Sequence, residues 1–264
     1  MSTTSTTPEA NAQYPMIKMY TNHGCGWCHR VHITLKELGL PFEEVLVDLD
    51  NPRPEWFLQL NPRGLVPVFQ YTPKPSSPTI TLTESAAIVS FLTDLYPSHL
   101  LPSITPLGTS PPSSGATSAA HLKYRMTFFT DTYFTKINPL MFKLVGADQG
   151  APQSKIVDDI ITLLETEIDP LLVDAAPFFG GSQKITVVEA MTTPFTVRLY
   201  DFSNDEIFPA SLAERMTGPT LPNFSRWVKL CMEHPSLTEP WDKEYYVPRI
   251  IERLPLAKKK YAAH

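Results

Sequence analysis

The chain has few cysteines, no long apolar run and no excess of positive charge, and each shortage excludes a class of protein. Three cysteines in 264 residues are too few for a disulfide-stabilised secreted scaffold. No window approaches the roughly 20 apolar residues that a membrane-spanning helix needs. The formal net charge of −5 argues against a surface built for nucleic acid. We therefore expect a cytoplasmic protein that binds neither nucleic acid nor membrane.

The apolar residues that are present divide the chain into a leader and two domains. Residues 1–15 are polar and predict a flexible leader. Over residues 16–101 the pattern predicts strand, helix and strand, followed by two strands and a helix, which is the order of a thioredoxin-like domain. Residues 102–118 are rich in Pro, Ser, Thr and Gly and predict a linker. Residues 119–264 repeat their apolar positions at helical spacing, so we expect an all-helical domain with a kink at Pro139.

The sequence Cys25-Gly26-Trp27-Cys28 stands where the first expected strand gives way to a helix. At a helix start, unpaired backbone N–H groups and the helix dipole stabilise a thiolate and lower the pKa of a cysteine to about 3.5–7.5. Cys25 is therefore the expected reactive thiol. Cys28 follows one turn later, either as a resolving thiol or as a small packing residue. Trp27 either stacks beside a substrate or covers the edge of the domain.

A metal site is the main alternative for this segment. Cys25, Cys28, His29 and His32 fall within eight residues, whereas structural zinc sites usually draw their ligands from two separated pairs. We therefore expect no metal and place both histidines on the helix surface. Cys231 lies in an apolar helical run and is expected to be buried and inert.

Two longer segments, "CGWCHRVHITLKELGLPFEEVLVDLDNPRPEWFLQLNPRGLVPVF" and "LTESAAIVSFLTDLYP", resemble the N-terminal domain of glutathione transferases. Within that family the chain resembles the fungal omega-like members, whose motif is C-P-[FYW]-x-x-R. Two positions depart from this motif. Gly26 replaces the proline, and Cys28 adds a second thiol that is typical of glutaredoxins. The resemblance implies an N-terminal thioredoxin-like domain, a C-terminal helical bundle and a homodimer.

The resemblance also implies a glutathione site and gives roles to its residues. Cys25 corresponds to the catalytic cysteine. Val66 precedes a cis-proline and pairs its backbone with the cysteinyl part of glutathione, while Glu84 and Ser85 hold the ammonium and carboxylate of the γ-glutamyl part. Arg53 lies where a basic residue meets the glycyl carboxylate. The implied glutathione-binding residues are Trp27, Arg53, Val66, Pro67, Glu84 and Ser85. Thr186 and Glu189 resemble the capping box of the central helix of the helical domain.

Three functions fit this pattern. The first is a glutathione-dependent thiol transferase or reductase, in which Cys25, with Cys28 as a possible partner, attacks a mixed disulfide. The second is conjugation of glutathione to an electrophile of fungal secondary metabolism, with Phe128, Phe129 and Tyr133 forming the substrate wall. These aromatic residues are equally suited to packing between helices. The third is a non-catalytic binding module that uses the same fold.

Overall fold

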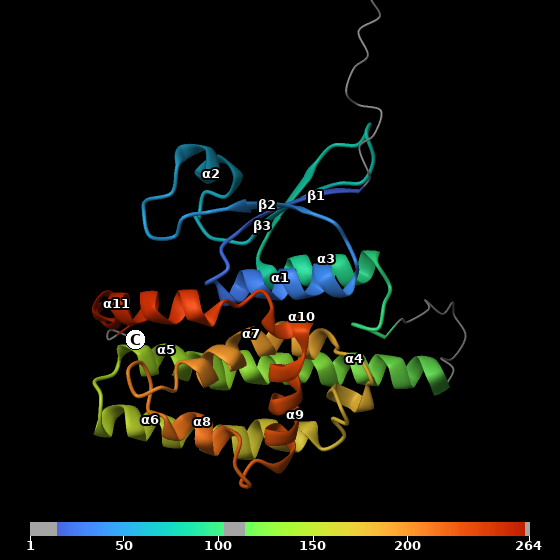
Figure 1. The fold of residues 1–264 in the computed structure, drawn as a ribbon. Coiled ribbons are helices and arrows are strands. Elements are labelled where there is room, and N and C mark those ends of the chain that lie inside the picture. The colour runs from blue at the N-terminus through green and yellow to red at the C-terminus, as the bar shows by residue number, and fades with distance from the viewer. Residues whose placement is uncertain (1–14, 103–113, 262–264) are drawn as a thin grey trace, which may run out of the picture.

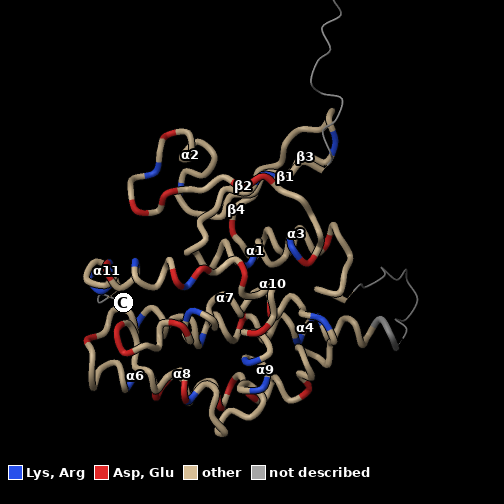
Figure 2. Tube along the Cα trace, in the orientation of Figure 1, with Lys and Arg blue, Asp and Glu red and all other residues tan. Residues whose placement is uncertain are grey.

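A small mixed sheet and a larger set of helices form separate layers of the computed structural model, which describes residues 15–102 and 114–261 (Figure 1). The expected leader, apart from its last residue, and most of the expected linker lie outside these described residues. None of the helices in the described part of the chain is long and apolar enough to span a membrane. Figure 2 shows that acidic and basic residues are interspersed along both layers.

The sheet has four strands in the order β2-β1-β3-β4. β1 (Met16–Thr21) runs parallel to β2 (Glu43–Leu46), and α1 (Gly26–Glu37) forms the crossover between them. β3 (Val68–Thr72) pairs antiparallel with β1, and β4 (Ile80–Thr83) pairs antiparallel with β3. The thioredoxin-like order expected from the sequence is therefore confirmed.

Helices cover the sheet because the strands and the helices each have an apolar face, and these faces pack against each other. α1 and α3 (Ser85–Leu95) lie between the sheet and the helical domain (Figure 1). The short α2 (Glu55–Leu60) follows β2 and was missed by the sequence analysis, because it is only six residues long and the neighbouring prolines read as a loop. Each fully buried aliphatic or aromatic side chain contributes about 1.5–3 kcal/mol. The core under the sheet includes Met19, Val31, Leu35, Phe69, Ile88 and Leu92.

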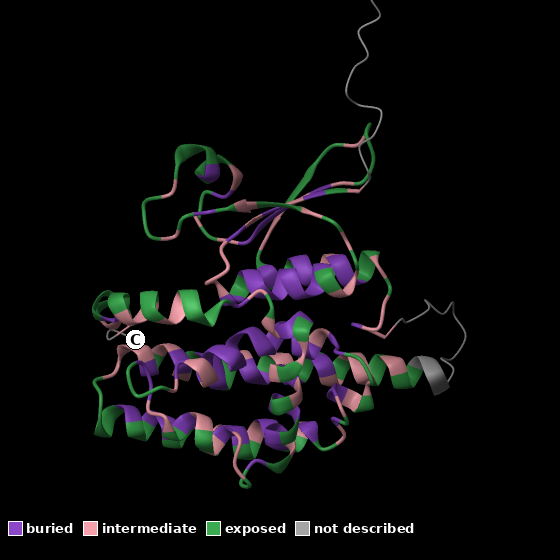
Figure 3. Ribbon diagram, in the orientation of Figure 1, coloured by how far each residue is buried: buried purple, intermediate pink, exposed green. Residues whose placement is uncertain are grey.

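The second domain is helical throughout, as expected. Its helices are α4 (Ser114–Thr132), α5 (Asn138–Gly146), α6 (Ala151–Leu163), α7 (Val187–Asp201), α8 (Ser211–Met216), α9 (Pro222–Glu233), α10 (Pro235–Thr238) and α11 (Lys243–Tyr261). α7 is the central helix, and every residue from Val188 to Leu199 is buried (Figure 3). The expected linker end at residue 118 is wrong. Helix α4 already begins at Ser114, because the alanine-containing end of that segment favours helix although its proline-rich beginning does not.

The long first helix of this domain changes its hydrogen-bonding pattern just before Pro139. A π-helical turn, Tyr133–Ile137, separates α4 from α5. Pro139 follows in the first turn of α5, and because it has no N–H group it cannot donate to a carbonyl oxygen of the helical turn before it. The irregularity predicted at Pro139 is thus present as a π-turn that precedes the proline.

The capping box at the start of α7 is confirmed. The backbone N–H of Thr186 donates to Glu189 Oε2 at 2.7 Å, and the N–H of Val188 donates to Thr186 Oγ1 at 3.1 Å. Glu189 Oε1 also accepts from the N–H of Phe179 at 2.9 Å and from Trp227 Nε1 at 2.7 Å. One buried carboxyl group therefore joins the helix start to two other segments of the domain.

Candidate active site

Cys25 is the N-cap of α1, directly after β1 and its short loop. Its backbone is extended (φ −84°, ψ 116°), and its carbonyl oxygen accepts the first helical hydrogen bond from the N–H of His29 at 3.1 Å. Hydrogen bonding from the Cys28 thiol and from the backbone N–H groups of Trp27 and Cys28 lowers the pKa of Cys25 to about 7, although burial opposes the shift. The predicted reactive thiol is thus about half ionised at neutral pH.

Cys28 differs from Cys25 in burial and in charge. Its side chain has no exposed surface, and burial together with the nearby Cys25 sulfur raises its pKa well above the usual value. Hydrogen bonding from the Thr21 side chain opposes this rise in the pKa of Cys28. Both cysteines are free thiols in the structure. Cys28 can therefore donate a hydrogen bond to the Cys25 thiolate and acts as a nucleophile only after losing its own proton.

Arg198 reaches the thiol loop from the central helix α7, and the sequence analysis missed it. Its Nη2 donates to the carbonyl oxygens of His23 and Gly24, at 3.2 Å each, and its Nη1 donates to that of Pro194 at 2.6 Å. Burial lowers the pKa of Arg198 to about 10, so the guanidinium stays charged at neutral pH. That charge lowers the pKa of Cys25 further. No local sequence signal connects positions so far apart in the chain.

Two further basic residues of α1 are more buried than expected. Nδ1 of His29 accepts from Arg198 Nη1 at 3.2 Å, because a guanidinium can only donate. His29 and His32 have exposed fractions of 1% and 8%, so their predicted place on the helix surface is wrong. Both face the neighbouring elements instead of solvent, because α1 is packed between the sheet and α7.

Arg30 links the thiol helix to the expected glutathione site. Its Nη1 donates to Ser85 Oγ at 3.2 Å, and its Nε donates to the carbonyl oxygen of Met191 at 2.9 Å. The guanidinium also lies 4.5 Å from the ring centre of Trp27 and 4.0 Å from that of Phe134. This arrangement holds the charge of Arg30 beside the Trp27 side chain.

A small cavity of about 220 Å³ brings together most of the residues predicted to bind glutathione. Its lining consists of Trp27, Asn61, Leu65, Val66, Pro67, Glu84 and Ser85. The Val66–Pro67 bond is cis, as expected. Glu84 has a positive φ of 68°, which is rare outside glycine and is often retained where a side chain must be aimed at a ligand. In the structure the Glu84 carboxylate pairs with Arg63.

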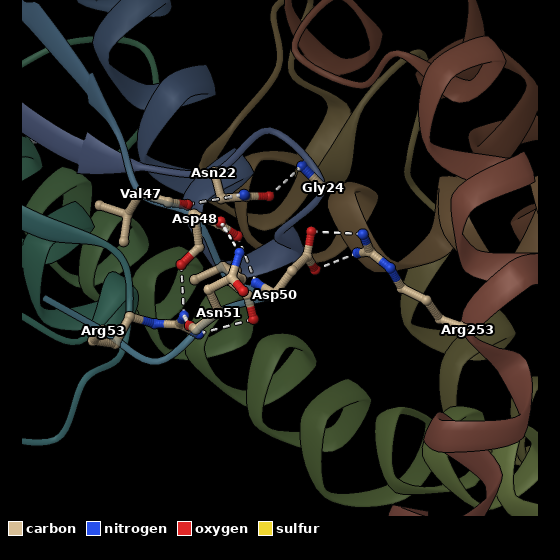
Figure 4. A network of polar contacts seen from close by, with 9 residues as sticks. Asn22, Gly24, Val47, Asp48, Asp50, Asn51, Arg53 and Arg253 are labelled. Atoms are coloured by element: carbon tan, nitrogen blue, oxygen red, sulfur yellow. Dashed lines mark hydrogen bonds and ion pairs between the residues drawn. The ribbon is translucent and has the colours of Figure 1, made fainter.

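Arg53, the sixth predicted residue, does not line this cavity. Its guanidinium donates to the backbone carbonyl oxygens of Asp48, Leu49, Asn51 and Gly64. Figure 4 shows Arg53 folded against the 48–51 loop, next to the ion pair that joins Asp50 to Arg253 of α11. Arg53 thus braces the loop, and its contact with a glycyl carboxylate stays a prediction.

A larger, mostly apolar cavity of about 490 Å³ adjoins the first at Trp27, which lines both. Its wall includes Arg30, Val89, Met126, Thr130, Phe134 and Met191. The predicted substrate wall of Phe128, Phe129 and Tyr133 needs correction. Phe129 and Tyr133 are buried in the core of the helical domain, and Phe128 is exposed and stacks on Tyr124. The correct helix was predicted, but the cavity meets its neighbouring face.

Comparisons with known proteins agree with this architecture. The family described as "Glutathione S-transferase, N-terminal domain" matches residues 24–95. Pyrimidodiazepine synthase of Drosophila melanogaster is 33% identical over 82 residues, which are 31% of this chain, so the chain spans only 32% of that relative's length. Glutathione S-transferase omega-1 of Sus scrofa is 23% identical over 246 residues, which cover 92% of this chain and 89% of the relative.

A solved structure extends the likeness to both domains. Glutathione transferase Omega 1C from Trametes versicolor superimposes with a TM-score of 0.73 at 23% identity, covering 92% of this chain and 98% of that one. Cys25, the cis-proline and all the residues that line the small cavity lie within the matched N-terminal segment. Residues 24–95 thus match the N-terminal domain of glutathione S-transferases, and the fold of the whole chain is that of an omega-type glutathione transferase.

Proposed function

We propose that the chain is a glutathione-dependent thiol transferase or reductase of the fungal omega-like type, with Cys25 as its nucleophile. The observation that carries this proposal is the position of Cys25. It is a cysteine with a lowered pKa at the start of α1, and Trp27, which follows it by two residues, lines the cavity formed by Val66, Glu84 and Ser85. A tyrosine or serine would activate the thiol of glutathione, whereas a cysteine thiolate itself attacks sulfur.

The reaction begins with a disulfide between glutathione and a substrate thiol. The Cys25 thiolate attacks the glutathionyl sulfur, the substrate sulfur leaves with the bond electrons and takes up a proton, and Cys25 becomes bound to glutathione. A second glutathione thiolate then attacks the glutathionyl sulfur, which releases oxidised glutathione and restores the Cys25 thiolate. Alternatively, Cys28 loses its proton and attacks Cys25, which releases reduced glutathione and leaves an internal disulfide.

The described residues supply three contributions to these steps. The N–H groups of the first turn of α1 and the Arg198 charge stabilise Cys25 as a thiolate when it attacks and when it leaves. Glu84, at the start of α3, offers a carboxylate for the glutathione ammonium group. The backbone of Val66 beside the cis-proline is available to pair with the cysteinyl part. The homodimeric state and the cytoplasmic location expected from the resemblance belong to the same proposal.

The apolar cavity favours conjugation as the second candidate. Its volume of about 490 Å³ and its place beside Trp27 suit a hydrophobic electrophile next to the glutathione sulfur. In that reaction a glutathione thiolate attacks the electrophile, and Cys25 contributes only its hydrogen-bonding environment.

Two parallel assays distinguish these functions. We expect the protein to reduce a glutathionylated peptide at the expense of glutathione, and Cys25→Ser to abolish this activity. Conjugation of glutathione to 1-chloro-2,4-dinitrobenzene that survives in Cys25→Ser, without any peptide reduction in the unaltered protein, would contradict the proposal. Glutathione binding without turnover in either assay would identify a binding module instead. Cys231→Ser is the matched control, because Cys231 is buried in α9.

A further inference from the structure

Three side chains with metal-binding groups converge beside α1, outside the two cavities. His23 comes from the loop before Cys25, His32 from α1 and Glu44 from the edge strand β2. Glu44 Oε1 lies 2.7 Å from His23 Nε2 and 3.3 Å from His32 Nε2, and all three ligand atoms lie within 4.8 Å of one another.

We propose that His23, His32 and Glu44 form a binding site for a divalent transition-metal ion of the zinc type. Zinc binds histidine nitrogen and carboxylate oxygen at about 2.0–2.2 Å, so the atoms around one tetrahedral ion lie about 3.3–3.5 Å apart. The 3.3 Å between His32 and Glu44 matches this spacing, while the 2.7 Å between His23 and Glu44 is a hydrogen bond that an ion would replace by moving the partly exposed His23 and Glu44 side chains apart. Two imidazoles with one carboxylate are a common three-ligand set that leaves the fourth position to water. Borderline imidazole ligands favour zinc, copper or nickel over magnesium or calcium.

The protonation state of the buried ligand suits this role. Burial lowers the pKa of His32 to about 4 although Glu44 opposes the shift, so its imidazole is neutral at neutral pH. A metal ligand must be deprotonated, and here no proton has to be displaced from a charged imidazolium of His32. Nε2 of His32 faces the cluster, because it lies 3.3 Å from Glu44 Oε1. The same nitrogen also lies 2.9 Å from Thr21 Oγ1.

A second histidine–carboxylate pair in the chain provides a comparison. His99 Nε2 lies 2.8 Å from Glu37 Oε2. Only the first cluster, among the described residues, adds a third ligand. A metal needs at least three ligand atoms that can surround one point, and His23, His32 and Glu44 each offer such an atom within 4.8 Å of the other two. A bound ion would join the Cys25 loop, α1 and β2.

Cobalt(II) titration of the reduced full-length chain tests this site and separates it from the thiols. Cobalt bound by nitrogen and oxygen shows visible d–d absorption, while cobalt bound by cysteine adds a sulfur-to-cobalt charge-transfer band in the near ultraviolet. We expect one equivalent of cobalt to bind without that band and to be displaced by zinc. Affinity should fall at least about tenfold in His23→Ala and in Glu44→Gln, since even outer-sphere substitutions in metal sites have effects of that size.

The matched controls are His99→Ala and Glu37→Gln, which remove a histidine–carboxylate pair that lacks a third ligand. They should leave cobalt affinity unchanged. His23 and Glu44 are partly exposed, so their substitution should leave the fold intact, and circular dichroism checks this. The proposal is overturned if no cobalt binds, if His23→Ala and Glu44→Gln bind it as tightly as the unaltered chain, or if all bound cobalt shows the sulfur band. The result does not depend on the proposed thiol-transfer activity.

Discussion

At the scale of the residue, Cys25 and Cys28 have different roles, which their spacing in the sequence does not distinguish. Cys25 receives the backbone N–H groups of the helix start, while Cys28 is enclosed by the core under the sheet. The same burial that keeps Cys28 protonated makes it a hydrogen-bond donor to the Cys25 thiolate. Cys25 is therefore the reactive thiol, while Cys28 stays protonated and reacts only after it has lost its proton.

The pH dependence of alkylation tests this division. Because the pKa of Cys25 is lowered to about 7, its rate of reaction with iodoacetamide should rise through a midpoint near pH 7 and level off above it, when the thiolate predominates. Peptide mapping should find the label on Cys25 and none on Cys28 in the folded protein. A midpoint near the ordinary thiol value of about 8.5 would contradict the account.

Arg198 is a positioning residue that should affect the pH midpoint of Cys25 alkylation. Arg198→Met removes both the nearby charge and the bonds to the His23 and Gly24 carbonyl oxygens, so the Cys25 midpoint should move to higher pH. The expected shift is a fraction of a pH unit, because the Arg198 charge lowers the pKa of Cys25 less than the hydrogen bonds at the helix start do. Arg198→Lys keeps the charge and should recover part of the shift. Arg215→Met, which alters a partly exposed arginine on α8 that pairs with Asp158, is the control. A midpoint unchanged in Arg198→Met would show that Arg198 acts on stability alone.

His29 predicts a pH dependence of stability. Burial and the Arg198 charge lower the pKa of His29 well below 6.5, so the folded state keeps it neutral while the unfolded chain binds a proton near pH 6.5. The free energy of unfolding should therefore fall as the pH drops below 6.5, by about 1.4 kcal/mol for each pH unit from this group. Urea unfolding at several pH values should show a shallower decline in His29→Gln. The exposed His121→Gln should match the unaltered chain, and an identical decline in all three proteins would refute this role.

At the scale of the element, α7 is the part on which both the core and the site depend. Its start is fixed by the capping box, its buried length packs the helical domain, and its last turns carry Arg198 to the Cys25 loop. Pro194 lies inside α7, and its carbonyl oxygen accepts from Arg198. The position of α7 therefore determines where Arg198 holds the loop that carries Cys25.

Removing Glu189 tests the anchoring of α7. Glu189→Ala leaves the N–H groups of Phe179 and Thr186 and the Trp227 indole without a buried acceptor, which should lower the free energy of unfolding by about 3 kcal/mol or more. Urea unfolding measures this loss. Glu165→Ala, at an exposed position after α6, should cost less than about 1 kcal/mol. Equal losses in the two variants would contradict the anchoring role.

Elements with local signals in the sequence were predicted correctly. A strand followed by a cysteine at a helix start predicts the position of the thiol. A proline within a strand-like run predicts the cis bond, and a threonine three residues before a glutamate predicts the capping box. The substrate wall was predicted on the wrong residues, because neighbouring positions on a helix differ by about 100° in direction. Thr130 and Phe134 line the apolar cavity, while Phe129, one position earlier than Thr130, faces the core.

At the scale of the whole molecule, the site is assembled across the boundary between the two domains. Arg198 of α7 donates to the carbonyl oxygen of Gly24 in the loop before α1, and the carbonyl oxygen of Met191 in α7 accepts from Arg30 of α1. Helix α11 contacts the first domain through the ion pair between Arg253 and Asp50. These contacts join residues more than 150 positions apart in the sequence. Such pairs follow from packing of the complete chain, so no local pattern of residues could have predicted them.

The central claim is that Cys25 forms a disulfide with glutathione. Intact mass after incubation with oxidised glutathione tests it directly in the unaltered chain, Cys25→Ser and Cys28→Ser. We expect one glutathionyl adduct to accumulate in Cys28→Ser and to be absent in Cys25→Ser. Resolution by Cys28 would convert the adduct of the unaltered chain into an internal disulfide. A glutathionyl adduct that persists in Cys25→Ser, or no adduct or internal disulfide in any of the three proteins, would contradict the account.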